Sequence, residues 1–228
     1  MTVCNATVPD KDASGDNLYG DVICSQTYID YFWETYGFEG NKSYWDDGFG
    51  WENPCDTSKP LARTFNACYL LTYSAEDYRN DDWDAPMLNW ARRYVRENTS
   101  RHRAKCGDGS AIAASFRGWF IKNRVELYRG FFFKHTVPER AGTLVHEARH
   151  QGGKSHNDEF PPGSIYGEGR DGADSDWDFQ GAWMYNALYL WWFYAEGART
   201  TSAMKQRAKH RGNLIINNAF AEHPGFTI

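Results

Sequence analysis

The sequence lacks several features that would place it in a common class of protein. It has five cysteines but no C-x-x-C pair, which argues against a thiolate zinc ribbon or a thioredoxin-type redox motif. Its net charge is −5, so the basic excess of a general nucleic-acid binder is missing. The longest apolar run, Ala182 to Ala195, is shorter than the ~20 residues that a membrane span needs. We therefore predict that the protein binds neither nucleic acid nor a membrane. We also expect a monomer.

A signal peptide is also missing, because the first residues have neither a basic start nor an apolar run. All five cysteines lie in the first half of the chain, and two disulfides plus one free thiol would suit an exported protein. We expect a secreted or periplasmic protein whose mature part is this sequence, with Met1 added for expression. Unpaired buried cysteines in a cytosolic protein are the alternative, and the spacing leaves the disulfide pairing open.

Aromatic side chains, in contrast, are abundant and make up 17% of the 228 residues. They bury large areas, so a single domain over residues 1–228 can form a packed core. We expect residues 1–60 to be largely irregular, with disulfides able to staple them, and residues 111–198 to carry the functional core. Helices are predicted over residues 25–36, 61–75, 85–98, 137–151, 176–195 and 200–220. Two or three strands between Ala111 and His135, turning near Lys122–Asn123, complete an α+β fold, and loops fill the rest.

Three of the seven histidines fall in one short segment, "HEARHQGGKSH", which begins at His146. Thr136 and Glu139 form a capping box before it, and Gly152-Gly153 ends the helix after it. At ~100° per residue, His150 lies about 40° and Glu147 about 100° around the helix from His146, opposite the apolar residues. Two imidazoles one turn apart can bind one Zn²⁺ ion, and the adjacent carboxylate can reach a water that the ion activates.

A third histidine, His156, follows at the spacing H-E-x-x-H-x-x-G-x-x-H, with Gly153 allowing the chain to turn back. This motif resembles that of the metzincin metallopeptidases. The preceding segment, "VELYRGFFFKHTVPERAGTLVHEARH", resembles the aspzincins, the deuterolysin-type proteases. The resemblance covers Arg124 to Asp178 and implies a zincin-like fold, mostly helical with a small mixed or antiparallel sheet, that hydrolyses peptide bonds with Zn²⁺.

The sequence departs from both families at the sites that complete the centre. Met184-Tyr185 is the only candidate for a metzincin methionine turn, and it lies in a predicted helix. An aspzincin would use an aspartate as third ligand in place of His156. The candidates for that ligand are Asp171, Asp174, Asp176 and Asp178. We favour His156, with Asp178 as the leading alternative.

These assignments give each candidate residue a role in the implied peptidase. His146, His150 and His156 would bind zinc, and Glu147 would act as general base. Tyr166 and Tyr185 are candidate donors to the oxyanion that forms during attack. A strand around Val125–Phe133 would pair with an extended peptide or protein substrate by edge addition. The alternatives are a binding module in which zinc is only structural, and a glycan-binding protein with an incidental zinc site.

Overall fold

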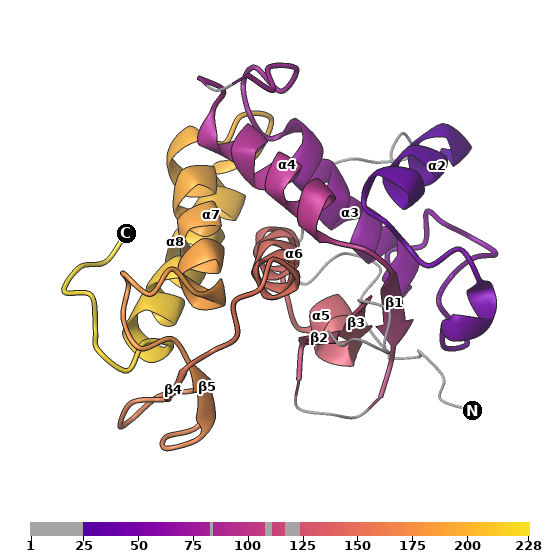
Figure 1. Ribbon diagram of the computed structural model, residues 1–228. Helices are drawn as coiled ribbons and strands as arrows, with labels where there is room; N and C mark the ends of the chain where they lie inside the picture. The colour runs from indigo at the N-terminus through magenta and orange to yellow at the C-terminus, as the bar shows by residue number, and fades with distance from the viewer. Residues whose placement is uncertain (1–24, 83, 108–110, 117–123) are drawn as a thin grey trace.

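The computed structural model describes residues 25–82, 84–107, 111–116 and 124–228 and shows an α+β architecture (Figure 1). The helices are α2 (Gln26–Thr35), α3 (Pro60–Tyr73), α4 (Met87–Asn98), α5 (Arg129–Phe133), α6 (Val137–Gln151), α7 (Ala182–Glu196) and α8 (Ser202–Asn218), with a 3-10 turn η1 (Lys42–Tyr44). The strands are β1 (His102–Lys105), β2 (Ala113–Phe116), β3 (Arg124–Tyr128), β4 (Asp158–Glu159) and β5 (Asp171–Ala173). Residues 1–24 of the predicted irregular N-terminal region and the turn near Lys122–Asn123 lie outside the described residues.

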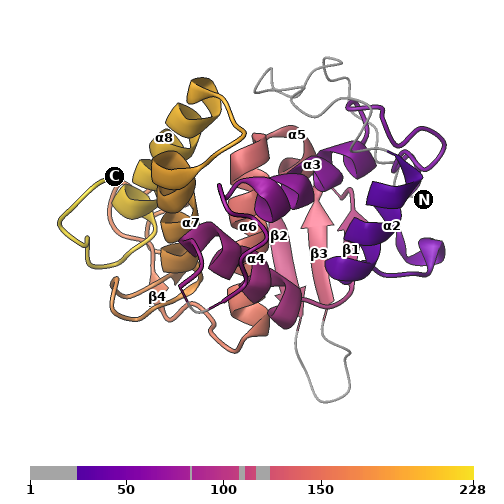
Figure 2. The same cartoon turned by 90° about the horizontal axis from the view of Figure 1, so that it is seen from above.

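Helix α6 occupies the middle of the molecule and separates its two sides (Figures 1 and 2). On one side lies a sheet of order β1-β3-β2, in which β3 pairs parallel with β1 and antiparallel with β2. On the other side α7 and α8 pack together, and the β4-β5 hairpin lies below them in Figure 1. Because α6 touches both sides, twelve of its fifteen residues are buried.

Three local predictions were wrong, each because tertiary contacts outweigh local preference. Residues 129–133 were predicted as strand but form α5, which buries Phe131 and Phe132 completely. The segment around His102–Lys105 was predicted as loop but pairs with β3 as β1. Helix α7 begins at Ala182 rather than at residue 176, because the preceding turn is closed by a 2.7 Å bond from Phe179 N to Asp176 Oδ1.

The cysteines divide into oxidised and reduced groups. Cys55 and Cys106 are disulfide-bonded, whereas Cys68 in α3 has a buried free thiol. Cys4 and Cys24 lie outside the described residues. In the described part of the chain, no helix combines the length and apolar character needed to cross a bilayer.

Because His102 is buried, we expect the free energy of unfolding to fall in mild acid. Burial lowers the pKa of His102 from 6.5 to about 4, although a 2.7 Å contact between Nδ1 and Tyr36 O partly opposes the shift. Below pH ~6.5 the His102 side chain binds a proton in the unfolded chain, whereas in the folded protein it stays neutral down to pH ~4. The free energy of unfolding is therefore highest, as far as His102 determines it, above pH ~6.5. It falls by about 1.4 kcal/mol per pH unit between pH ~6.5 and pH ~4.

Urea unfolding between pH 6 and pH 4.5 measures this effect. On unfolding in this pH range, the native chain takes up roughly one proton at His102. We expect His102→Gln to lose this uptake, so that its unfolding free energy falls less steeply as the pH is lowered. His210→Gln, at an exposed position on α8, is the matched control and should leave the slope unchanged. Equal slopes in the two variants would show that His102 is not responsible.

Candidate metal centre

Helix α6 places two histidines of the H-E-x-x-H motif side by side. It begins after Thr136, whose backbone N–H donates to Glu139 Oε2 at 2.7 Å, and it ends at Gln151 as predicted. His146 and His150 lie one turn apart, with their Nε2 atoms 3.1 Å from each other. The helix alone therefore supplies two adjacent ligand atoms.

The third histidine joins this pair through the turn that follows α6. Gly153 has a φ of 107°, a value that a side chain would disfavour, and the chain there turns back on itself. Ligand atoms of His146, His150 and His156 lie within 4.8 Å of one another, which is close enough for one metal ion. Trp183 of α7 packs beside the three histidines, with its ring centroid 4.5 Å from that of His146.

Backbone and carboxylate acceptors orient two of the imidazoles. His150 Nδ1 lies 2.6 Å from Lys154 O, and His156 Nδ1 lies 2.8 Å from Asp174 Oδ1. Because a carbonyl or carboxylate oxygen only accepts, Nδ1 is the donor in both contacts, which leaves Nε2 as the ring atom that can bind a metal. Asp174 is fully buried and also accepts from Trp183 N at 3.0 Å, at the start of α7. Such outer partners hold ligating histidines in one tautomer.

The same surroundings favour the neutral form of the two histidines on α6. Burial, followed by the neighbouring His150 and His156, lowers the pKa of His146 well below its usual value. Burial and His156 lower the pKa of His150 to about 4. Metal ions bind neutral imidazole, and the Nε2 atoms of His146 and His150 lie 3.1 Å apart with His156 in reach, a donor set suited to one cation. The residues present therefore fit a resident metal ion.

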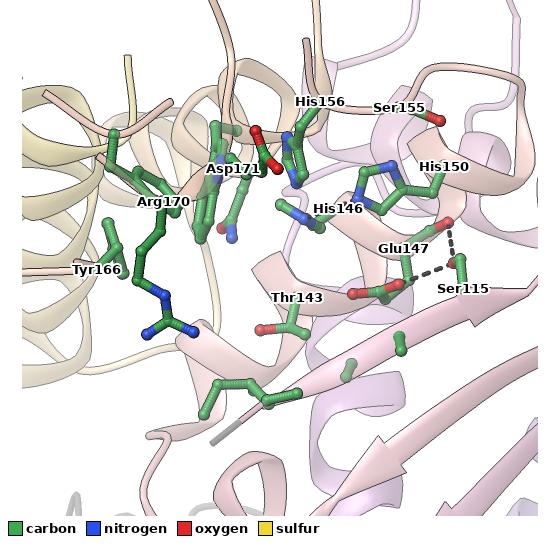
Figure 3. Close-up of a pocket in the computed structure, with 18 of the residues that line it drawn as sticks. Ser115, Thr143, His146, Glu147, His150, Ser155, His156, Tyr166, Arg170 and Asp171 are labelled. Atoms are coloured by element: carbon green, nitrogen blue, oxygen red, sulfur yellow. Dashed lines mark hydrogen bonds between the residues drawn. The ribbon is translucent and has the colours of Figure 1, made fainter. Parts of the chain in front are cut away.

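Glu147 lies in the same cavity as the histidines (Figure 3). Its Oε2 is 2.8 Å from Ser115 Oγ on β2, and that hydroxyl also lies 3.2 Å from the Glu147 carbonyl oxygen. Burial raises the pKa of Glu147 to about 7, although the Ser115 bond opposes the shift. A carboxyl group of this kind can both accept and release a proton near neutral pH.

The cavity has a volume of about 720 Å³ and runs along strand β2. Ala111, Ala113, Ala114 and Ser115 line it on that side, and their small side chains leave room for a ligand. The prediction that the strand around Val125–Phe133 offers the free edge was wrong. In the described sheet β3 lies between β1 and β2, so β2 is the edge strand at the cavity.

The remaining predicted residues fall into different places. Tyr166 lines the cavity, and its buried hydroxyl has no hydrogen-bond partner among the described residues. Tyr185 instead packs against Trp90 and Tyr94 on α4 and does not line the cavity. Asp178 lies in an exposed turn outside the cavity.

Two other predicted site residues, Asp176 and Met184, serve in local structure. Asp176 accepts from the neighbouring Phe179 N. Met184 lies inside α7, so it forms no methionine turn.

Two residues of the site were not assigned their roles from the sequence. Asp174 stood among the candidate ligands, but its bonds to His156 and α7 were not foreseen. Ser115 belongs to a short strand of small residues with no local signal of function. Both contacts join segments far apart in the chain, so spacing could not reveal them.

The bond between Asp174 and His156 predicts a weaker site when the carboxylate is neutralised. Asp174→Asn can present an N–H group to His156 Nδ1–H, which disfavours the tautomer that exposes Nε2. We expect zinc affinity to fall by roughly 10- to 100-fold, as measured by competition with a chromophoric chelator. Asp176→Asn, two residues away and outside the cluster, is the control and should bind zinc like the native chain. Equal affinities for both variants would contradict an orienting role for Asp174.

No protein-family model matches the chain, and no curated protein or solved structure is significantly similar to it. The fold and the site together define an α+β protein whose three clustered histidines could hold a metal ion.

Proposed function

We propose that this protein is a zinc-dependent peptidase that hydrolyses peptide bonds of proteins or peptides outside the cytosol. The observation that carries the proposal is the position of Glu147. This carboxylate shares one cavity with the three-histidine cluster but is not a member of it. The other buried carboxylate beside the cluster, Asp174, is bonded to His156 and orients it. Among the described residues, the Glu147 carboxylate is instead bonded to Ser115 and to no histidine of the cluster, as suits a general base.

His146, His150 and His156 would hold the ion, which supplies Lewis-acid activation of water and of a substrate carbonyl. Glu147 would accept the proton of the attacking water and pass it to the amine that leaves. Ser115 would keep the carboxylate of Glu147 pointed into the cavity. Tyr166, with its unpartnered hydroxyl, would donate to the oxyanion.

The substrate is proposed to bind in extended form along the edge of β2. An extended peptide can add to a free strand edge by backbone hydrogen bonds, and this edge borders the cavity. The bonded state of Cys55 and Cys106 supports export, because disulfides persist in oxidising compartments.

The test is hydrolysis of an unfolded protein by the zinc-loaded chain, with the new termini read by mass spectrometry. We expect cleavage that a chelator abolishes and that added zinc restores. Stoichiometric zinc binding without cleavage of any peptide would overturn the proposal. It would leave a binding module in which the metal is structural.

A further inference from the structure

The cavity extends beyond the histidines to an end that carries two arginines. Tyr166 and Arg170 lie across the histidines from Glu147 and Ser115 (Figure 3). Arg211 of α8 lines this end too, with its guanidinium carbon 5.6 Å from the ring centroid of Tyr166. Two arginine side chains therefore line the same end of the cavity.

Glu139 contacts one nitrogen of the Arg211 guanidinium, Nε. The Arg211 side chain is only 15% exposed, and its Nε lies 3.6 Å from Glu139 Oε1. The other oxygen of Glu139 is used at the start of α6, where it accepts from Thr136 N at 2.7 Å. Among the residues that the structure describes, none hydrogen-bonds the terminal Nη groups of Arg211. The forked end of this guanidinium is thus available to a ligand.

The forked end of the Arg211 guanidinium, rather than an excess of positive charge, favours an anion here. The exposed Arg170 adds a second positive charge, and Asp171 and Glu139 balance the two arginines, but Glu139 faces only Nε of Arg211. A planar guanidinium matches the oxygens of a carboxylate, with which arginine forms paired hydrogen bonds.

We propose that Arg211 determines specificity by binding a carboxylate of the substrate next to the scissile bond. This inference rests on the proposed peptidase function. The carboxylate can come from an aspartate or glutamate side chain or from the C-terminus of the peptide. Both sources present the same planar anion, which a guanidinium binds in the same way.

Matched peptides distinguish these sources and test the role of Arg211. One set is amidated at its C-terminus and carries Glu or Gln at a single scanned position. A second set keeps Gln and ends, one residue beyond the cleaved bond, in a free carboxylate or an amide. The ratio of kcat/KM within each pair is measured for the native chain, Arg211→Gln, Arg211→Lys and Arg207→Gln. Arg207 lies one turn earlier on α8, outside the cavity, and serves as the matched control.

We expect the native chain and Arg207→Gln to prefer the carboxylate by roughly 10- to 100-fold in one set, since charge-assisted hydrogen bonds are lost with the amide. Arg211→Gln should abolish the preference, and Arg211→Lys should retain part of it. The set that shows the preference identifies the source. Equal cleavage of all peptides, or a preference that survives Arg211→Gln, would overturn the inference but leave the peptidase proposal intact.

A binding measurement separates the two proposals if no peptide is cleaved. Calorimetry with zinc-loaded Glu147→Gln compares the same peptide pairs without turnover. Tighter binding of the carboxylate peptide, lost when Arg211→Gln is added, would support the inference even if hydrolysis failed. Identical affinities within every pair would refute it.

Discussion

Glu147→Gln is expected to lower peptide hydrolysis by about 10²- to 10⁴-fold, the usual contribution of a positioned general base. The amide has nearly the shape of the carboxylate and can still accept from Ser115, whose Oγ lies 2.8 Å from Oε2. It cannot take a proton from water. Because Glu147 is not a member of the histidine cluster, the variant should still bind one zinc ion per chain.

The measurement combines kcat/KM on a cleaved peptide with the zinc content of the purified protein. Glu159→Gln, an exposed glutamate on β4 outside the cavity, is the control and should match the native chain in both. Activity of Glu147→Gln within a few-fold of the native value would remove Glu147 from the mechanism. Loss of zinc together with activity would assign it a role in metal binding instead.

His156→Ala is expected to weaken zinc binding by more than about 100-fold, beyond the usual cost of losing an outer partner such as Asp174. The substitution removes one of three imidazoles whose ligand atoms lie within 4.8 Å of one another. It also leaves the buried carboxylate of Asp174 without its 2.8 Å contact to Nδ1. Two histidines on α6 alone would form an incomplete site.

Asp178→Ala is the matched comparison, because Asp178 was the alternative third ligand and lies in an exposed turn. We expect it to bind zinc as the native chain does. Zinc competition by chelator, with thermal unfolding of each metal-free variant to verify folding, gives both results. The reverse pattern, with Asp178→Ala weakened and His156→Ala unaffected, would show that the aspartate completes the centre.

The parts of the site that could be predicted from the sequence are those set by local rules. The ends of α6 follow from the capping box at Thr136 and Glu139 and from Gly152-Gly153, and the helix spans Val137–Gln151 as expected. The relative directions of His146 and His150 follow from helical geometry. The approach of His156 follows from a glycine that permits a turn.

Local rules failed where distant segments compete for the same residues. Strand β1 forms because β3 provides a pairing edge, and α5 forms because its aromatic side chains have a core to enter. The identity of the edge strand depends on the order of all three strands, which no single segment contains. The prediction that β3 lies at the edge of the sheet was wrong for this reason.

The sequence by itself determined a capped helix that carries two histidines and a glutamate, with a third histidine in reach, because these relations span only a few turns of chain. The tertiary structure alone decided that Asp174 orients His156 across 18 residues and that Ser115 contacts Glu147 across 32. It also brought Arg211 of the last helix to the far end of the cavity. Such contacts depend on how α6 packs between the sheet and α7–α8, and packing is a property of the whole chain.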